Sequence, residues 1–359
     1  MLHFSLQRRL FLWATGYASL LHRAFALPAR TLVFPRDHGA HPDFQSEWWY
    51  LTGSAMAGTR RLGFQVTFFR KRVEATQGMT SRFAAKQLIV AHAAVTDVQG
   101  KKLWHDQRID RAGFGISQAD ASDTAIVLGD WRLARQSANG SYRAQIHARD
   151  FALDLQFTPS QGVLLQGHNG LSRKGPDEKQ ASYYYSQPQL QTTGSIRVQG
   201  QQLQLQDGTA WLDHEWSQEL LHPDAVGWDW IGINLFDGAS LMAFQLRQKD
   251  GSALWTGGTY RAAARSAQPH IASPGEVQFQ AVRGWKSPLT GATYPVQWLV
   301  RTPADYYTVK ALLDNQESDS RASTGIVYWE GLCELSNSNG SVVGRGYLEM
   351  TGYAGALKV

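Results

Sequence analysis

The sequence predicts an all-β protein built from two antiparallel β domains, each a sandwich or a barrel, that are related by an internal repeat. Short apolar and aromatic segments recur about every ten to fifteen residues, with turn residues such as Asn139-Gly140 between them. No long segment of the first half has the 3.6-residue period of a helix. A run of matched residues also returns at a constant distance of 180 positions.

The composition describes a foldable chain of two domains. Its 359 residues exceed what one ordinary core accommodates. Hydrophobic residues make up 43% and charged residues 18%, which excludes a disordered protein. Thirteen Trp and 34 Gly are typical of an aromatic-rich β protein with many tight turns. Cys333 is the only cysteine, so the chain forms no internal disulfide and no thiolate metal site.

The N-terminus predicts an export signal over residues 1–26 that resembles the twin-arginine type. Arg8 and Arg9 precede an apolar run, and the small-x-small pattern that ends at Ala26 suits a signal peptidase. The alternative is an uncleaved membrane anchor, although the apolar run falls short of the roughly eighteen residues that a span requires. We therefore expect cleavage near Ala26 and a periplasmic or otherwise exported protein.

The charge balance excludes nucleic-acid binding. Removal of the leader, which contains three arginines and no acid, lowers the net charge by three, from +5 to +2. No long basic run comes after the leader, so the mature chain lacks the electrostatic footprint of a nucleic-acid-binding protein.

The first half is expected to begin with a strand pair. The segment from Leu51 to Arg70 predicts a hairpin around Ala57-Gly58. Further strands are expected over residues 87–96, 125–133, 142–148, 151–157 and 162–167. The stretch from Gly194 to Gly208 is polar and rich in Gln, which indicates a boundary between the halves. We expect an N-terminal domain over residues 30–215 and a C-terminal domain over residues 216–359.

The second half predicts strands of the same kind. They are expected over residues 256–260, 277–282, 294–300, 306–313, 326–335 and 344–352, with an Ala-rich loop over residues 261–270. The repeat matches seven pairs of positions in the two halves: Trp48 and Trp228, Tyr50 and Trp230, Leu51 and Ile231, Gly58 and Gly238, Leu62 and Met242, Phe64 and Phe244, and Gln65 and Gln245. We interpret it as two related domains, each opening with an aromatic strand, a Gly turn and a return strand. The alternative is coincidence among Trp-rich strands.

The segment from Trp211 to Trp230 combines aromatic and ionisable side chains more densely than the rest of the chain. Asp213, His214 and Asp229 lie among its four Trp. Indole rings supply apolar area and a face that attracts cations, and carboxyl and imidazole groups transfer protons. This mixture predicts an apolar cavity with an acid at its wall. The alternative is a strand whose Trp face a core and whose charges face water.

Several motifs resemble those of the AttH/CrtC family. They are His38-Gly39-Ala40-His41-Pro42, Glu47-Trp48-Trp49-Tyr50, Gly167-His168-Asn169-Gly170-Leu171-Ser172-Arg173-Lys174-Gly175, Ser182-Tyr183-Tyr184-Tyr185-Ser186, Trp211-Leu212-Asp213-His214-Glu215-Trp216, Gly227-Trp228-Asp229-Trp230 and Tyr328-Trp329-Glu330-Gly331. The resemblance extends from about residue 34 to the C-terminus. It implies two lipocalin-like β-barrels side by side, in agreement with the repeat.

The resemblance implies two functions. The family includes carotenoid 1,2-hydratases, which add water to a terminal double bond of an acyclic carotenoid. It also includes exported proteins, often labelled predicted secreted hydrolases, that accompany AttEFG-type ABC transporters. The His-x-Trp element implicated in the hydratases corresponds here to His214 and Trp216. The strand that matches the hydratases' other proton-transfer residues carries Phe244 and Gln245, which transfer no proton, so the resemblance favours the second branch.

Hydration of an alkene defines the catalytic residues that we expect. The reaction requires an acid that protonates carbon, stabilisation of the carbocation, and delivery of water. A buried Asp can stay protonated, so Asp213 or Asp229 would be the acid, and His214 would position the acid or the water. The alternative for each Asp is a turn or cap contact at a strand end.

The ligand-binding residues that we expect are mostly aromatic. Arg173 could meet an anionic head group, although the loop that contains it and His168 could equally be a solvated hairpin turn. Of the consecutive residues Tyr183 to Tyr185, neighbours must point to opposite sides of a strand. The full set is Trp48, Tyr50, His168, Arg173, Tyr184, Trp216, Trp228 and Trp230.

No metal and no cofactor are expected. His38 and His41 would hold a metal only if a third ligand such as His168 or His214 came close. The chain has no Gly-x-Ser-x-Gly element and no phosphate-binding Gly loop.

We expect an exported protein that binds a long apolar ligand (a lipid, isoprenoid or polyene), and the alternative is a carotenoid 1,2-hydratase-like lyase. The expected partners are that ligand, an ABC transporter permease and, peripherally, the membrane; a structural adaptor for the transporter is a third class.

Overall fold

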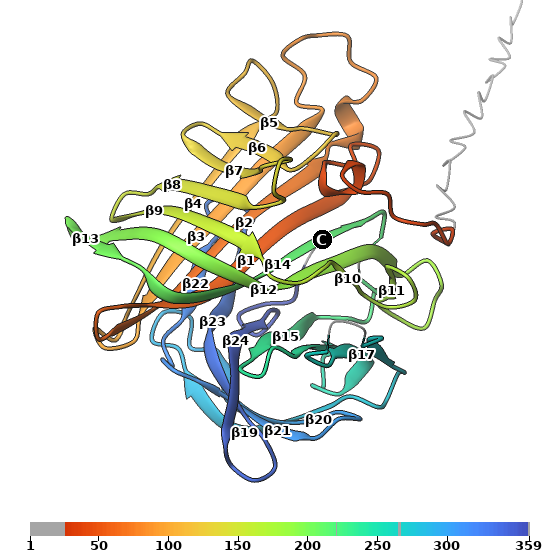
Figure 1. Ribbon diagram of the computed structural model, residues 1–359. Helices are drawn as coiled ribbons and strands as arrows, with labels where there is room; N and C mark the ends of the chain where they lie inside the picture. Colours follow the sequence, from red (N-terminus) through yellow and green to blue (C-terminus); the bar gives the residue numbers. More distant parts are fainter. Residues whose placement is uncertain (1–25, 220, 265–266, 358–359) are drawn as a thin grey trace, which may run out of the picture.

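The chain forms two antiparallel β-sheets that lie against each other (Figure 1). A computed structural model describes residues 26–219, 221–264 and 267–357. The predicted export signal therefore lies, except for Ala26, outside the described residues. Among the described residues, no helix has the length and hydropathy needed to cross a bilayer.

The first sheet, sheet A, has fourteen strands in the order β4-β3-β2-β1-β14-β12-β9-β8-β7-β6-β5, and β10, β11 and β13 pair with β12. Its strands β3 and β4 contact β5 and β6 at the other end of this order, so the sheet curls into a nearly closed barrel. The strands are β1 (Ser46–Ala57), β2 (Arg60–Arg72), β3 (Gln87–Asp97), β4 (Lys102–Arg111), β5 (Ser117–Ala119), β6 (Ala125–Leu128), β7 (Trp131–Arg135), β8 (Tyr142–His147), β9 (Phe151–Pro159), β10 (Leu164–Leu165), β11 (Leu171–Arg173), β12 (Ala181–Val198), β13 (Gln201–Gln204) and β14 (Gln206–Ser217). Two short 3-10 helices, η1 (Arg36–His38) and η2 (Glu74–Thr76), lie before β1 and after β2.

The second sheet, sheet B, has ten strands in the order β18-β17-β16-β15-β24-β23-β21-β20-β19, and β22 pairs with β23. The strands are β15 (Gly227–Leu235), β16 (Ser240–Arg247), β17 (Ala253–Arg261), β18 (His270–Ala272), β19 (Gln278–Lys286), β20 (Thr293–Arg301), β21 (Tyr306–Ala311), β22 (Glu317–Ser320), β23 (Ile326–Ser336) and β24 (Val342–Met350). The predicted all-β class with two lipocalin-like antiparallel domains is confirmed.

The two sheets share one topology, as the repeat predicts. In each sheet the first strand, β1 or β15, pairs with the second strand and with the last. Trp48 and Trp228 both lie on the side of these first strands that faces the other sheet. The predicted match of the second strands is wrong, because Phe64 packs inside sheet A whereas Phe244 packs between the sheets. The turn after β15 shifts the pairing of the second hairpin by three residues relative to the first, which reverses the faces.

The Gln-rich stretch from Gly194 to Gly208 is part of sheet A and not a linker. It forms the end of β12, all of β13 and the start of β14. Its apolar residues Ile196, Val198 and Leu203 alternate with polar ones and pack into the core. This alternation is expected of a strand with one face in the core and the other in solvent. The chain passes to sheet B between Ser217 and Gly227. The expected strand over residues 125–133 is two strands, separated by a turn at Gly129.

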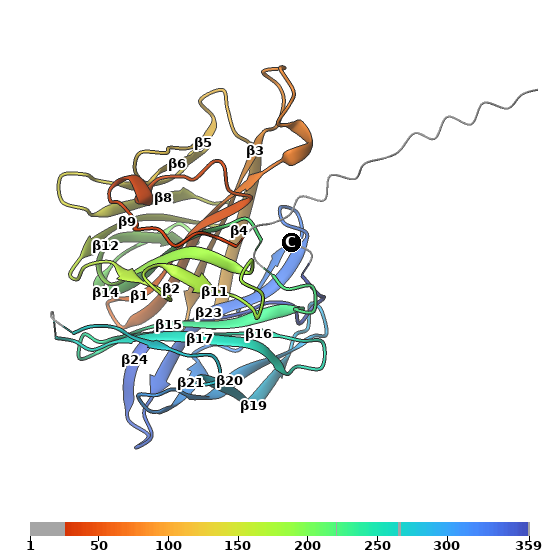
Figure 2. The ribbon, with the colours of Figure 1, turned by 90° about the vertical axis from the view of Figure 1, so that its right-hand side faces the viewer.

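Figure 2 shows sheet B lying against sheet A, and β1 and β14 of sheet A contact β24 and β15 of sheet B. A hydrophobic layer lies between the two sheets. We call its aromatic members the aromatic layer: Trp48, Tyr50, Tyr184, Trp211, Trp228, Trp230, Phe244, Trp255 and Tyr347. Buried hydrogen bonds also join the sheets directly. The Tyr328 hydroxyl lies 2.9 Å from His92 Nδ1, and the Thr96 hydroxyl donates to Gln316 Oε1 at 2.8 Å.

Candidate functional site

Strand β14 divides the predicted site residues between two environments. Alternate residues of a strand point to opposite faces. Trp211 and Asp213 point into the aromatic layer, whereas His214 and Trp216 point to the inner side of sheet A. Asp213 and His214 therefore belong to different sites, although they are neighbours in the sequence.

The Asp213 carboxyl group is buried in the aromatic layer and is held by three neutral donors. Its Oδ2 accepts from the Tyr184 hydroxyl at 2.7 Å, and its Oδ1 accepts from the Ser186 hydroxyl at 2.5 Å and from the Trp211 indole N–H at 2.6 Å. Burial disfavours the carboxylate more than these hydrogen bonds favour it, and it raises the pKa of Asp213 to about 7. This group can therefore hold or release a proton near neutral pH.

Sheet B contributes two further carboxyl groups to the same region. Glu330 on β23 and Glu349 on β24 are directly paired across the strands, and Glu349 is also paired with Trp230 on β15. Burial, followed by the neighbouring carboxyl groups, raises the pKa of Glu330 and of Glu349. Asp213 is one of the charges that act on Glu349, so acids of both sheets meet in the layer.

Aromatic rings surround these acids. The Trp230 indole N–H donates to the Tyr184 hydroxyl at 3.2 Å, and its ring lies edge-on to Tyr50 with 5.3 Å between centroids. Tyr184 and Trp230 are almost fully covered, whereas Trp48 and Trp228 are half-buried at the margin of the layer. Edge-on aromatic pairs of this kind add to the stability that burial provides.

Lys174 closes one side of the layer. Its Nζ lies 3.0 Å from Glu215 Oε1, 4.7 Å from the centre of the Tyr184 ring and 4.5 Å from that of Phe244. The ammonium group is thus paired with Glu215 and lies over two ring faces, an arrangement that stabilises a buried cation.

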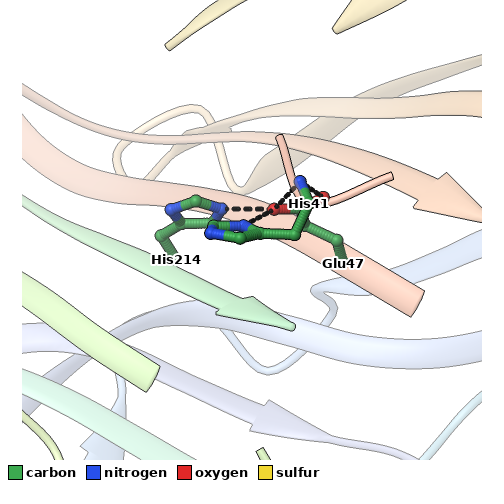
Figure 3. A group of neighbouring side chains, drawn as sticks. All are labelled: His41, Glu47 and His214. Atoms are coloured by element: carbon green, nitrogen blue, oxygen red, sulfur yellow. Dashed lines mark hydrogen bonds and ion pairs between the residues drawn. The ribbon is translucent and has the colours of Figure 1, made fainter. Parts of the chain in front are cut away.

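His214 belongs to a polar cluster inside sheet A that is centred on Glu47 (Figure 3). Glu47 Oε1 lies 2.9 Å from His214 Nε2 and 2.7 Å from His41 Nδ1. Its Oε2 accepts from Arg70 Nε at 2.7 Å and from the His41 backbone N–H at 2.9 Å. Trp49 and Trp216 stack on the two imidazoles, with 4.5 Å between the Trp49 and His214 centroids and 3.7 Å between those of Trp216 and His41.

Through Glu47 and Arg70, this cluster holds the segment from Asp37 to Phe44 against β1 and β2. We call it the Glu47 clasp: Asp37, His41, Glu47, Arg70 and His214. Burial alone would raise the pKa of Glu47, but the hydrogen bonds from His214 and His41 outweigh it and hold that pKa well below its usual range. Burial lowers the pKa of His214 to about 4, so its imidazole is neutral at pH 7.

The Glu47 clasp brings together three groups that bind metals in other proteins. The ligand atoms of His41, Glu47 and His214 lie within 4.8 Å of one another. However, each of these atoms is already in a hydrogen bond of 2.7 to 2.9 Å, and the Arg70 guanidinium supplies the positive charge next to Glu47. The cluster therefore fits a structural role better than a metal site.

Asp229 lies in a third place, inside sheet B. It pairs with Arg247 at 2.8 Å and accepts from Gln245 at 2.7 Å and from the Tyr353 hydroxyl at 3.0 Å. Burial raises its pKa, while the charge of Arg247 lowers it. The group fastens the segment after β24 to the hairpin of β15 and β16, as the Glu47 clasp fastens the segment before β1.

His168 and Arg173 lie at the margin. His168 is exposed in a tight turn in which Asn169 and Gly170 have positive φ angles of 53° and 91°. The Arg173 guanidinium lies 5.4 Å from the centre of the Trp255 ring and donates to the backbone oxygens of Gly175 and Pro176.

The structure therefore brings together five predicted ligand-binding residues around one predicted catalytic residue. Trp48, Tyr50, Tyr184, Trp228 and Trp230 line the layer that holds Asp213; Trp216, His168 and Arg173 do not. Reasoning from the sequence considered Lys174 only beside Arg173, as a contact for an anionic head group, and missed Glu215, Glu330 and Glu349 as members of this layer. Lys174, Glu215 and Glu330 belong to the family motifs, but nothing in the sequence indicated that β24 would lie beside β15.

Comparison with known proteins agrees with this architecture. A family model described as AttH-like matches residues 25–353. A solved structure from Nitrosomonas europaea, described as a candidate AttH, is 48% identical, covers 91% of this chain and 99% of its own, and has a TM-score of 0.84. The comparison with curated proteins gives no match.

Two more distant structures share the fold. Kievitone hydratase from Nectria haematococca is 14% identical, covers 90% of this chain and 94% of its own, and has a TM-score of 0.69. CghA with Sch210972 is 10% identical, covers 86% of this chain and 88% of its own, and has a TM-score of 0.54. At these identities the likeness shows the fold alone.

Proposed function

The chain belongs to the AttH-like family, and from this premise we propose that it binds a long, apolar, unsaturated ligand in the aromatic layer between its two sheets. One observation carries the proposal: Asp213 is buried among Tyr184, Trp211 and Trp230 with only neutral hydrogen-bond partners among the described residues. A carboxyl group without a cation costs stability in such a place, and groups retained at such a cost often serve function.

The aromatic layer suits an isoprenoid or polyene chain. Conjugated double bonds stack on indole and phenol faces, and Trp48 and Trp228 at the half-buried margin offer the first contacts. Entry requires the two sheets to separate locally, since Tyr184 and Trp211 are almost fully covered. Such opening is compatible with an interface that is largely side chain against side chain.

Acid-catalysed hydration of a double bond is the second candidate, and the raised pKa of Asp213 favours it. The Asp213 carboxylic acid, directly or through the Tyr184 hydroxyl, would give its proton to one alkene carbon, and the other carbon would become a cation. The faces of Trp211 and Trp230 would stabilise that cation, an effect of roughly 2 kcal/mol when desolvated. Water would then attack the cation and return a proton to the Asp213 carboxylate, which restores the acid.

Lycopene supplies a test of both candidates. Uptake should quench Trp fluorescence, and Trp230→Ala should weaken binding at least tenfold, which corresponds to about 1.4 kcal/mol. Trp285→Ala, outside the layer on β19, is the matched control and should bind as the unchanged protein does. Hydration should yield a product one water heavier, and Asp213→Asn should abolish it while retaining binding. Equal binding by the Trp230→Ala variant would contradict the proposed site.

Export and an ABC transporter partner stay part of the proposal. The family resemblance and the paired arginines of the leader support them, and fractionation of cells that express the full chain tests the first. Replacement of Arg8 and Arg9 by Lys should retain the protein in the cytoplasm. Cross-linking of the exported chain to a permease tests the second, and an adaptor without a ligand would cross-link but leave Trp fluorescence unquenched by lycopene.

A further inference from the structure

Exposed apolar side chains gather at one end of sheet A. Five of the eleven large hydrophobic residues that are most exposed in the described chain lie there, on the connection from β2 to β3 and on β4 with the turn after it. Figure 1 shows both connections at the same end of the sheet, at the top of the view. We call this group the tip patch: Met79, Phe83, Ile109, Phe114 and Ile116.

The two connections touch each other through aromatic rings that remain open to solvent. The Phe83 and Phe114 rings lie nearly parallel, with 5.6 Å between centroids and 28° between planes. Their exposed fractions are nevertheless 73% and 51%. The Arg111 guanidinium lies 4.5 Å from the Phe114 centroid and 5.5 Å from that of Phe83, and it donates to the Phe83 carbonyl oxygen at 3.0 Å.

Hydrogen bonds hold this arrangement in a defined shape. Thr76 donates to the Ala85 carbonyl oxygen at 2.7 Å, and Gln77 donates to that of Lys86 at 2.7 Å, so the β2 to β3 connection is closed at its base. In the other connection the Gly113 N–H donates to the Ser117 carbonyl oxygen at 2.7 Å. The apolar tips are therefore presented in place before any partner arrives, which lowers the entropy cost of docking.

Positive charge surrounds the tip patch. The two segments and the adjoining strand ends carry Lys71, Arg72, Arg82, Lys86 and Arg111 against Glu74 and Asp110. The Glu74 carboxylate is paired with Arg72 at 2.6 Å, which leaves the cations in excess. Aromatic and aliphatic tips with a cationic border match the interface of an anionic bilayer, where rings enter the headgroup region and cations meet lipid phosphates.

We propose that the tip patch docks the protein on an anionic lipid surface. This proposal does not depend on a ligand in the aromatic layer, and it specifies which face of the molecule meets the membrane. A protein partner is less suited to the tip patch, because a stable protein interface involves roughly 20–30 residues on each side and the patch has five. The exposed side chains of Arg82 and Lys86 attract the phosphates of an anionic bilayer, which strengthens the docking.

Flotation with lipid vesicles tests the proposal. The full chain is used throughout, so that its leader contributes equally to every variant. Vesicles of equal parts phosphatidylglycerol and phosphatidylcholine should carry the protein, and vesicles of phosphatidylcholine alone should carry at least tenfold less. The double variant Phe83→Ser with Phe114→Ser should lose at least tenfold in binding to the anionic vesicles. Arg82→Glu with Lys86→Glu should lose a similar factor. Added salt should weaken the binding of the unchanged chain to anionic vesicles and affect this charge variant less.

The matched control is Val282→Ser with Leu289→Ser. These residues are 57% and 54% exposed on and beside β19 of sheet B, so the control also removes two exposed apolar side chains, at a distant place. It should bind anionic vesicles as the unchanged chain does, and all variants should share its circular dichroism and melting temperature. Equal loss in the control, or unchanged binding of the Phe83→Ser with Phe114→Ser variant, would overturn the proposal. A dimer in sedimentation that this variant dissociates, together with no vesicle binding, would assign the patch to a second copy instead.

Discussion

Asp213 and His214 are consecutive residues of β14 whose side chains point to opposite faces of sheet A. One is an acid in the layer between the sheets, and the other is a neutral imidazole that holds Glu47 inside the first barrel. The side chains of the His-x-Trp element that the family resemblance implicates therefore lie on the face of β14 opposite to the acid. Any role of His214 in chemistry at Asp213 has to act through the position of β14.

Asp213→Asn should change how stability depends on pH. The folded pKa of about 7 exceeds the ordinary value of 3.8, so between these values the folded protein holds a proton that the unfolded chain has released. The contribution of Asp213 to the free energy of unfolding should therefore fall as pH rises through this window and level off above it. The Asn variant lacks this contribution. The difference in stability, variant minus unchanged protein, should therefore be larger at pH 8 than at pH 4. Urea titrations at several pH values measure the difference, and a constant difference would show that the pKa of Asp213 is not raised by folding.

Tyr184→Phe should distinguish the role of the Tyr184 hydroxyl in proton transfer from its role in stability. The variant removes the hydroxyl that lies 2.7 Å from Asp213 and receives the Trp230 indole N–H. We expect a loss of about 1 kcal/mol in stability. Under the second proposed function, hydration, product formation should fall at least tenfold. Mass spectrometry of the lycopene product checks the second part. Tyr183→Phe is the control on the other face of β12, and product formation as high in Tyr184→Phe as in this control would argue against a relay through Tyr184.

Arg70→Met should destabilise the first barrel strongly. The guanidinium is fully buried, pairs with Glu47 and donates to the carbonyl oxygens of His41 and Phe44 at 2.8 Å. Its removal leaves a buried carboxylate without its cation, which costs about 3–5 kcal/mol. Denaturant unfolding measures the loss, and Arg143→Met is the matched control because the exposed pair of Arg143 and Asp154 should contribute about 1 kcal/mol or less. Similar values for the two variants would mean that the Glu47 clasp stabilises little.

Gly53→Ala should be costly for a steric reason. A β-carbon at this position of β1 would lie 2.5 Å from the Phe64 ring and 2.6 Å from the Thr209 carbonyl oxygen. Relief requires strands β2 and β14 to shift, and we expect a loss of about 1–3 kcal/mol. Gly78→Ala is the control, because its β-carbon would meet no atom within 4 Å. Thermal melts that show equal shifts for both variants would contradict close packing at Gly53.

The fold class was predictable because strand signals are local. The hairpin of β1 and β2, the tight turn at Asn169 and the pairing of β15 with β16 all result from short patterns of aromatic, β-branched and turn residues. The predicted match of Phe244 with Phe64 was wrong, because the turn after β15 changes the register of the second hairpin. Register depends on both strands and on the turn between them.

The site was predictable only in part. The alternation rule that separates Tyr183 from Tyr184 also separates Asp213 from His214, so the division of the acid and the imidazole was available from the sequence once β14 was taken as a strand. The acids Glu330 and Glu349 were not, because their approach to Asp213 depends on how the two sheets pack. Likewise, Arg70 and Glu47 are 23 positions apart, and only the pairing of β1 with β2 brings them together.

The closing of each sheet by its last strand has a consequence for biosynthesis. Ser46 pairs with Ser217, and Leu235 pairs with Gly344, so neither sheet can complete its hydrogen bonds until its final strand has been synthesised. Contacts this distant in sequence make folding slow, and β1 and β15 stay half-paired while the ribosome adds the remaining strands. A chain that stops before β24 would leave an open strand edge on β15, ready to pair with another unfinished copy.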